Sequence, residues 1–491
     1  MKRSKFSLSN TKLFTCNMGE LIPMGLLEVL PGDTIQQATS ALIRCSPLLA
    51  PVMHPVHVRI HHWFVPHRLV WDDWEDFITG GPDGDDASVL PTITTPASTG
   101  FAVGTLADYF GIPPGAASLP VSALPFRAYA LIWNEWYRDQ DLQTELTVSK
   151  ASGTDTTTNT TLQNVAWEKD YFTSSRPWTQ KGPEITVPLG TTAPVVPSGD
   201  DIQLMFGGVG PRNLTGLASN AMNYSGAGLA GTTNARFGTQ TGLEADLSNA
   251  QGVSINVLRE AFALQRYEEA RARYGSRYTE YLRYLGVRSS DARLQRPEYL
   301  GGGRQTIQFS EVLQTGPDTE DEGVANLKGH GIGAMRSNRY RRFFEEHGYI
   351  ISVISVKPKT IYAQGLPRTW SRQTKEDFFQ RELQHIGQQE IYNKEVYALH
   401  ANPDNVFGYQ DRYDEYRRTE STIAGEFRTT LNYWHLARIF GSAPALNADF
   451  VKSDPATRIY ASTSTDGLLI MANHSVQARR LLSRMGNSFI Y

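Results

Sequence analysis

Five of the chain's 11 histidines lie within a short stretch, where imidazole nitrogens could act as metal ligands or general bases. They are His54, His57, His61, His62 and His67. His57 and His61 share one face of a predicted strand, but four strand residues separate them by roughly 13 Å. Only neighbouring chains could complete a metal site around them. We therefore predict a polar strand face at an interface rather than a metal centre.

Other patterns with catalytic or ligand-binding potential are weak. Acidic clusters at 83–86 and 318–322 carry the carboxylates that Ca²⁺ prefers, but neither has EF-hand spacing, so they are interpreted as solvated loops. Gly226–Gly231 matches GxGxxG, yet it follows loop-like sequence rather than a buried strand. The sequence contains no P-loop, GxSxG or HExxH motif. We predict no enzyme activity, no cofactor and no metal.

Basic residues gather in short clusters, and one of them surrounds a tyrosine. Arginine binds phosphate well, and a tyrosine ring can stack on an unpaired base, so these clusters suit single-stranded DNA. The candidate DNA contacts are Lys2, Arg3, Lys5, Arg336, Arg339, Tyr340, Arg341 and Arg342. A further cluster, Arg479, Arg480 and Arg484, lies near the C-terminus.

An alternative for the central cluster is purely structural. If the segment were helical, Arg341 and Arg342 would pair with Glu345 and Glu346 one turn later and form a solvated face. The sequence does not decide between this arrangement and a DNA contact.

Composition limits the class of protein. The 491 residues are enough for a large core, and no apolar run approaches the roughly 18 residues of a membrane helix. The net charge of −3 argues against a dedicated nucleic-acid-binding protein. Cys16 and Cys45 lack metal or redox spacing and are interpreted as reduced side chains in a protein made in the cytoplasm. The basic N-terminus leads into no apolar segment, so we expect no secretory signal.

Hydrophobic periodicity predicts a mixture of strands and helices. Strands are expected at Val56–Val65 and Tyr349–Val356, and helices at 123–143, 256–275 and 374–398. The aromatic stripe of the first helix is expected to pack in the core. Strands separated by long, unequal insertions favour an antiparallel β-barrel or sandwich with helices in its loops over a parallel sheet.

The texture of the chain changes between residues 144 and 252, which are rich in Thr, Ser, Gly, Asn and Pro. Only four charged residues occur between Ile185 and Leu243. Low charge and many turn formers predict an inserted, surface-exposed region of loops and short strands.

Several long strings resemble the major capsid proteins of the Microviridae, especially the gokushovirus-like branch, and they follow the family's order. They are NMGELIPMGLLEVLPGD (17–33), SPLLAPVMHPVHVRIHHWFVPHRLVWDDWEDFITGG (46–81), ALPFRAYALIWNEWYRDQDLQ (123–143), SSDARLQRPEYLGG (289–302), QGLPRTWSR (364–372), IGQQEIYNKEVY (386–397) and FGYQDRYDEYR (407–417). The resemblance covers most of the chain outside 144–252. The stretch after about Ala443 departs most from the family's pattern.

The resemblance implies a fold and a function. The fold would be mainly β, an eight-stranded antiparallel jelly roll over residues 1–491 with long loop and helical insertions. About 60 copies would form a T=1 icosahedral bacteriophage capsid around circular single-stranded DNA, with basic side chains on its inner surface. Residues 144–252 would form a variable protrusion at the threefold axes that faces the host.

The resemblance also implies partners and a location. The expected partners are further copies of the chain, packaged DNA, a bacterial surface receptor and minor spike, pilot or DNA-binding virion proteins. The protein would be made in the bacterial host cytoplasm and end in the virion, without membrane insertion.

Two other functions remain open from the residues alone. A lectin-like or carbohydrate-active jelly-roll protein would need a cleft with paired carboxylates or a metal, and no spacing in the sequence singles one out. A soluble single-stranded-DNA-binding protein conflicts with the net charge.

Overall fold

The structure, a computed structural model, describes residues 3–183, 185, 255–274, 277–288, 290–291, 295–313 and 327–484, together with six short strands between 195 and 245. The chain divides into two compact units, one made of Met1–Thr179 and Tyr274–Tyr491 and the other of Gln180–Arg273. None of the described helices combines the length and the apolar composition that crossing a bilayer requires.

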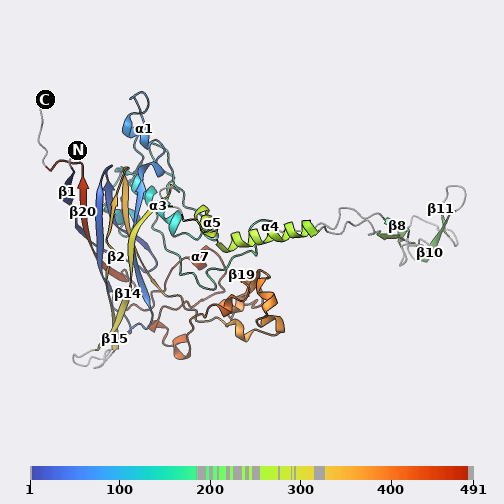
Figure 1. The fold of residues 1–491 in the computed structure, drawn as a ribbon. Coiled ribbons are helices and arrows are strands. Elements are labelled where there is room, and N and C mark those ends of the chain that lie inside the picture. The colour runs from blue at the N-terminus through green and yellow to red at the C-terminus, as the bar shows by residue number, and fades with distance from the viewer. Residues whose placement is uncertain are drawn as a thin grey trace. The chain divides into compact units, whose positions relative to one another are not determined.

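Ten strands of the first unit form one curled antiparallel sheet (Figure 1). They are β1 (Ser4–Ser7), β2 (Asn10–Cys16), β3 (Leu21–Val29), β4 (Thr34–Cys45), β5 (Val56–Pro66), β14 (Glu298–Leu313), β15 (Leu327–Arg336), β16 (Tyr340–Phe343), β17 (Gly348–Pro358) and β20 (Leu468–Arg480). One half, called the first sheet, has the order β1/β2-β20-β4-β15, with β16 also paired to β4. The other half, called the second sheet, has the order β14-β5-β17-β3.

This strand order is that of a jelly roll. With β1 and β2 counted as one strand and β16 as an addition at the edge, eight described strands remain, and their chain order runs 1-8-3-6 in the first sheet and 5-4-7-2 in the second. Strand β14 links the halves because its N-terminal part pairs with β5 and its C-terminal part with β15. The expected eight-stranded antiparallel jelly roll is confirmed.

The core of the barrel lies between the two sheets, where alternate side chains of each strand point inward. Ile43 of β4 and Ile470 of β20 meet Ile60 of β5 and Ile354 of β17, and all four are at most 2% exposed. The predicted strands at Val56–Val65 and Tyr349–Val356 are confirmed as β5 and β17.

Long insertions follow β5 and β17, and they carry most of the helices. The described elements of the first insertion within the first unit are η1 (His67–Leu69), α1 (Trp74–Thr79), β6 (Thr92–Thr94), α2 (Leu106–Phe110), β7 (Pro120–Ser122), α3 (Leu124–Trp136) and α5 (Tyr278–Tyr284). Those of the second are η2 (Arg368–Trp370), η3 (Lys375–Asp377), η4 (Arg381–His385), β18 (Gln388–Tyr392), α6 (Asn393–Val396), β19 (Val406–Asp411), η5 (Asp414–Tyr416), η6 (Gly425–Arg428), η7 (Asn432–Trp434) and α7 (Ala448–Val451).

Helix α3 covers the outward face of the second sheet. Its Tyr129 and Trp133 are buried in one cluster with Trp63 of β5 and Ile351 of β17. The Tyr129 hydroxyl donates to the Leu21 carbonyl at 2.8 Å, which fixes the helix against β3. The predicted helix and the core role of its aromatic stripe are confirmed, although the helix ends at Trp136 rather than at 143.

The helix predicted over 374–398 is wrong. Two short 3₁₀ turns, strand β18 and one helical turn, α6, occupy this segment. The backbone groups that a helix would pair internally have other partners: the Gln380 amide donates to the Tyr413 hydroxyl at 3.2 Å, and β18 pairs with β19. Gly387, with φ +118°, separates the turns from β18.

The second unit contains the remaining described elements. They are β8 (Val195–Pro197), β9 (Gln203–Phe206), β10 (Val209–Gly216), β11 (Met222–Tyr224), β12 (Ala235–Phe237), β13 (Leu243–Ala245) and α4 (Ile255–Tyr274). Strands β11-β10-β9-β12 form one sheet and β13-β8 another. The predicted helix 256–275 is confirmed as α4. The bounds of this unit differ from those of the inserted region expected from the sequence, 144–252. Residues 144–179 belong to the first unit, where Trp167 and Phe172 are buried.

Candidate nucleic-acid interface

Basic residues from three distant parts of the chain meet on neighbouring strands of the first sheet. Lys5 of β1 lies opposite Arg479 of β20, and Arg479 lies opposite Thr34 of β4. On the other side of β4, Arg341 of β16 lies opposite Gln36. Antiparallel pairing therefore brings the N-terminal, central and C-terminal basic clusters to one end of one sheet.

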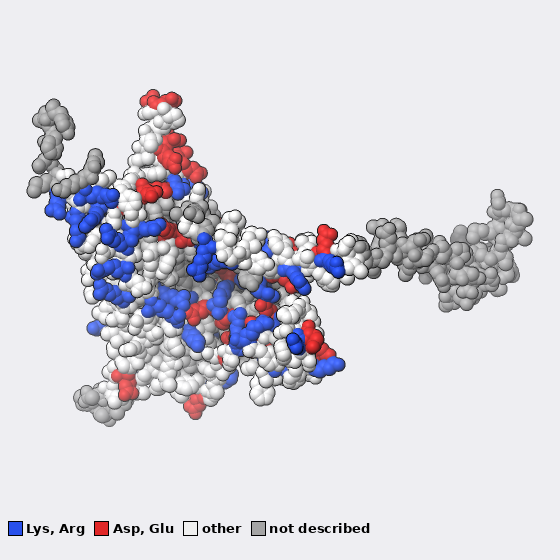
Figure 2. All heavy atoms as spheres, in the orientation of Figure 1, with Lys and Arg blue, Asp and Glu red and all other residues white. Residues whose placement is uncertain are grey.

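The basic side chains point outward because their neighbours in the sequence point into the barrel. Ile35 and Ala478, which alternate with Thr34 and Arg479, are both 0% exposed. Lys5, Arg341 and Arg479 themselves are exposed. Figure 2 shows Lys and Arg side chains gathered over this part of the molecule, near the β1 and β20 labels of Figure 1.

The outward face of the first sheet carries several cations. Alternation and register place Lys5, Arg44, Arg336, Arg341 and Arg479 there, and we call these five residues the basic sheet face; Lys328 of β15 is a further cation on the same side of the sheet. None of the five has a carboxylate partner among the described residues, and the outward positions of the described strands include no Asp or Glu. Its electrostatic potential is therefore positive.

Arg44 was missed by sequence reasoning, since it stands alone in the sequence. It is exposed and lies opposite Leu469 of β20 and Ile332 of β15. The available signal was the alternation in β4, where Ile35, Ala41 and Ile43 face inward and the even-numbered residues face outward.

The other candidates at this end differ in their surroundings. Arg3 is exposed, donates to the Thr34 hydroxyl at 3.2 Å and lies 5.0 Å from the centre of the Phe343 ring. Arg339 is exposed in the connection between β15 and β16 and has no carboxylate partner among the described residues. Lys2 lies outside the described residues, as do Gly226–Gly231 and the acidic cluster 318–322.

Tyr340 is not available for base stacking. Its ring is 9% exposed, lies 5.5 Å from the His62 ring, and its hydroxyl donates to Gln37 at 2.8 Å. Burial also raises the pKa of this hydroxyl. The register of β16 turns Tyr340 inward when Arg341 points outward, so this expectation is corrected.

The structural alternative for Arg341 and Arg342 is also corrected, because β16 is a strand and helical spacing does not apply. Arg342 pairs with Glu298 of β14 at 2.6 Å, while Glu346 pairs with Arg68 at 2.5 Å. Glu298 thus partly neutralises the charge of Arg342, whereas Arg341 has no carboxylate partner among the described residues.

The early histidines are held by partners in the same chain. The contacts join His54 Nε2 to the Lys359 carbonyl (2.7 Å), His61 Nδ1 to the Tyr137 hydroxyl (2.7 Å), and the two nitrogens of His62 to Ser352 (2.8 Å) and Ser337 (3.1 Å). Among the described residues no three His, Cys, Asp or Glu side chains gather as metal ligands do. Cys16 and Cys45 are free and buried.

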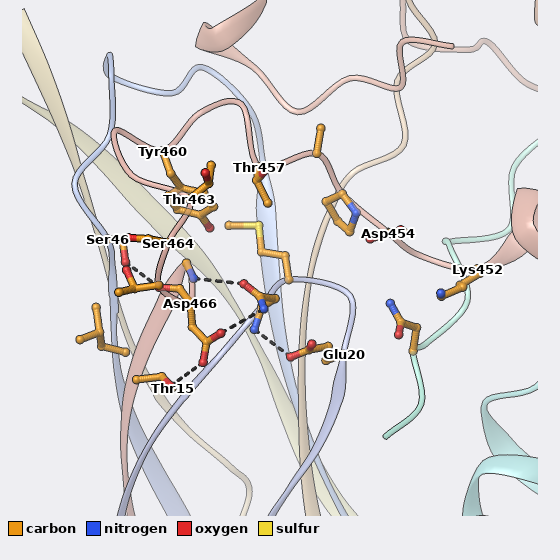
Figure 3. A pocket seen from close by; sticks show the side chains of 18 residues that line it. Thr15, Glu20, Ser46, Lys452, Asp454, Thr457, Tyr460, Thr463, Ser464 and Asp466 are labelled. Carbon is orange, nitrogen blue, oxygen red and sulfur yellow. Dashed lines mark hydrogen bonds between the residues drawn. The ribbon is translucent and has the colours of Figure 1, made fainter. Parts of the chain in front are cut away.

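A cavity of about 790 Å³ lies beside the start of β3 and the segment before β20 (Figure 3). Three of its lining residues, Glu20, Asp454 and Asp466, are acidic. Asp466 accepts hydrogen bonds from the Thr15 hydroxyl (2.5 Å) and the Asn17 side-chain amide (3.2 Å), and Glu20 accepts one from the Asn17 backbone N–H (2.8 Å). Burial raises the pKa of Glu20. Two of the three carboxylates hold the chain in place, which gives no support to a glycosidase-like site.

Comparisons with known proteins give the family of the chain. The family model for the phage capsid protein (F protein) matches residues 1–489. Capsid protein VP1 of Bdellovibrio phage phiMH2K is 40% identical over 94% of this chain and 90% of its own length. VP1 of Chlamydia phage 1 is 33% identical over 92% of this chain and 90% of its own length. VP1 of Spiroplasma virus 4 is 34% identical over 92% of this chain and 88% of its own length.

These matches confirm the resemblance seen in the sequence and give no support to an enzyme or a lectin-like protein. The three relatives match 92–94% of the chain, and the residues matched by the family model include both sheets of the barrel and both long insertions. The chain belongs to the phage capsid F protein family and is a structural capsid subunit of a microvirus virion.

Proposed function

We propose that the basic sheet face lines the inside of the capsid and holds packaged single-stranded DNA by its phosphates. The observation that carries this proposal is the convergence of Lys5, Arg341 and Arg479 on one sheet face, where the described residues supply no carboxylate. A row of uncompensated cations repels itself, and phosphates between the side chains would remove that repulsion. Such contacts would be independent of base sequence, as a shell around a whole genome requires.

The proposed contact set differs from the one that the sequence suggested. Arg44 and Arg479 join Lys5, Arg336, Arg339 and Arg341, while Tyr340 leaves the set because it is buried. Lys2 and Arg3 remain candidates at the N-terminal end. Arg342 is a weaker candidate because it pairs with Glu298.

The test compares two double substitutions that remove equal charge. R341Q/R479Q neutralises the basic sheet face, and K375Q/R381Q neutralises two exposed cations of the second insertion. We expect particles of the first variant to hold less nuclease-protected DNA and to release it at lower salt, because fewer phosphates are neutralised. Equal DNA content and equal salt resistance in the two variants would refute the proposal.

The shell geometry and the role of the inserted region belong to the same proposal. About 60 copies would form a T=1 shell, with the compact unit Gln180–Arg273, or the wider region 144–252, as a host-facing protrusion at the threefold axes. The compactness of this unit as a part of its own supports its role as an addition to the shell. An icosahedral reconstruction of purified particles would test both statements, since density at the threefold axes must disappear when residues 190–240 are deleted.

The remaining proposed partners are the host receptor and minor spike, pilot or DNA-binding virion proteins. Mass spectrometry of purified particles would identify the virion proteins. A cell-binding assay with the 190–240 deletion would test the receptor, because particles that lack a host-facing protrusion should no longer attach.

A further inference from the structure

A second concentration of cations lines a cleft on the outward face of the second sheet, which we call the basic cleft. It measures about 520 Å³ and lies between β5, β17, the end of α3 and the segment 165–169. Its cationic side chains are Arg59, Arg138, Lys169, Arg277 and Lys357. Among the described residues, two carboxylates, those of Asp139 and Glu168, line the same space.

The two carboxylates are already bound. Glu168 Oε1 lies 2.6 Å from Arg59 Nη2 and 3.7 Å from Arg304 Nη2. Asp139 pairs with Lys169 and also lies 3.6 Å from Arg176. The cleft therefore keeps an excess of positive charge after its internal pairs are formed.

Lys357 lies in surroundings that are unfavourable for a cation. Its side chain is 8% exposed, and its ammonium donates to the Ala166 carbonyl at 2.7 Å but has no carboxylate partner among the described residues. Burial, followed by the charge of Arg59, lowers its pKa to about 8. An anion entering the cleft would compensate a charge that the isolated subunit leaves unpaired.

The aromatic residues of the cleft favour a carboxylate over a nucleotide as that anion. Trp136 is stacked on Trp63 at 4.7 Å, and Arg296 lies 4.2 Å from the centre of its ring. The Tyr137 hydroxyl is bound to His61 and Trp63. The Trp136 ring is thus already stacked, and the Tyr137 hydroxyl already has its hydrogen-bond partners. The cleft also lies outside the second sheet, whereas the basic sheet face lies outside the first, and in a barrel these faces point in opposite directions.

The same subunit exposes a segment of opposite charge. Residues 72–86, called the acidic arm, contain α1 and carry seven carboxylates and no Lys or Arg. Six of these seven residues are exposed, and none of the seven pairs with a cation among the described residues. Figure 2 shows these carboxylates gathered on the projection that carries α1. Phe77 and Ile78 are 39% and 49% exposed on the same helix.

We propose that the acidic arm of one subunit docks in the basic cleft of a neighbouring subunit in the capsid. A capsid subunit touches further copies of itself, so a charged arm and an oppositely charged cleft on one chain are complementary across such a contact. The tip of the arm, Gly80–Asp86, contains three glycines and one proline, and its three carboxylates, Asp83, Asp85 and Asp86, are all exposed. Docking would also cover Phe77 and Ile78.

The first test uses unmodified virus particles and a zero-length carbodiimide, which joins a carboxylate to an amine only where they touch. Lys169 is the reporter because its side chain is 47% exposed. We expect the crosslinked dimer band to contain a peptide with Asp83, Asp85 or Asp86 joined to a peptide with Lys169. Arm carboxylates joined only to other lysines would overturn the proposal.

The second test uses a cysteine pair, Asp85→Cys with Lys169→Cys. The chain's own Cys16 and Cys45 are buried, and burial raises the pKa of Cys45 to about 12, so background disulfides are suppressed. The control pairs Asp85→Cys with Lys375→Cys, because Lys375 is 86% exposed and more accessible than Lys169. Mild oxidation of particles should give subunit ladders with the first pair and monomers with the control.

Two results would overturn the proposal. One is an equal yield of ladders from both cysteine pairs. The other is ultraviolet crosslinking of genome DNA to the peptide that contains Lys357, without any crosslink between arm and cleft, which would assign the cleft to the genome. If the double variant forms no particles, the carbodiimide result on unmodified particles decides alone.

Discussion

Lys5 of β1 and Arg479 of β20 occupy directly opposed positions of two antiparallel strands, 474 residues apart in the chain. Both side chains are exposed, and no carboxylate pairs with either among the described residues. Like charges in opposed positions destabilise a sheet, so this pair has an energetic cost in the free subunit. The cost is understandable if an anion lies across the pair in the assembled particle.

Substitution of Lys5 with Gln should stabilise the free subunit. We expect the free subunit to gain up to about 1 kcal/mol at low salt, because the repulsion from Arg479 is removed. The gain should shrink in high salt, where screening already weakens the repulsion. Urea unfolding of the free subunit measures both effects, and Lys5→Arg, which keeps the charge, is the control. A destabilised K5Q subunit would contradict the interpretation.

The buried histidines should make the subunit sensitive to acid. Burial lowers the pKa of His62 to about 3 and those of His54, His61 and His67 to about 4, whereas an unfolded chain titrates near 6.5. Below about pH 6.5 these histidines therefore bind protons in the unfolded state but not in the folded state. Their contribution to the free energy of unfolding is fully present above that pH. It falls as the pH drops toward 4, by up to about 1.4 kcal/mol per pH unit for each histidine.

Urea unfolding at pH 7.5, 5.5 and 4.5 would measure this loss. His62→Gln should make the pH dependence shallower, although it lowers stability at pH 7.5 because the contacts to Ser337 and Ser352 change. The same substitution at the exposed His330 is the control. Unchanged stability between pH 7.5 and 4.5 would show that the histidines do not control acid sensitivity.

The pair Arg127–Asp155 should be essential for the position of α3. Both side chains are 0% exposed, Arg127 Nε lies 2.8 Å from Asp155 Oδ2, and the guanidinium also donates to the carbonyls of Val70 and Ala151. Burial would raise the pKa of Asp155, but hydrogen bonds from Thr158 and Arg127 outweigh it and lower the pKa to about 2. Asp155→Ala leaves a buried guanidinium without its anion, which should cost about 3–5 kcal/mol.

Denaturant unfolding measures that loss, and the double substitution R127M/D155A tests its origin. Because the double variant buries no unpaired charge, it should recover part of the stability that D155A loses. A loss below about 1 kcal/mol in D155A, or a double variant that is less stable than D155A, would contradict this explanation.

Removal of residues 190–240, with a short Gly/Ser linker in their place, should leave the barrel folded. The strands of the jelly roll all belong to the unit formed by Met1–Thr179 and Tyr274–Tyr491, so their pairing does not require the deleted segment. We expect a soluble subunit with nearly unchanged β-sheet circular dichroism and thermal midpoint. A control deletion of 392–411, which removes β19, should be destabilising. Insoluble protein from the 190–240 deletion would mean that the barrel depends on the insertion.

The sequence by itself determined the family, the class of fold and the elements whose side chains repeat with a clear period. Strand β5 follows from alternation, β17 from a continuous apolar run, and helices α3 and α4 from helical spacing. The helix expected over 374–398 failed because its backbone partners, Tyr413 and β19, lie further along the chain. Local periodicity carries no information about such partners.

Only the tertiary structure decided which residues meet. Antiparallel register joins Lys5, Arg479 and Arg341 on one sheet face, adds the isolated Arg44, and turns Tyr340 into the core. A shift of one residue in β16 would exchange Tyr340 and Arg341 between core and surface, since side chains alternate along a strand. The basic cleft has the same origin: its cations come from β5, from β17 and from three segments of the first insertion, and only the packing of that insertion onto the second sheet brings them together.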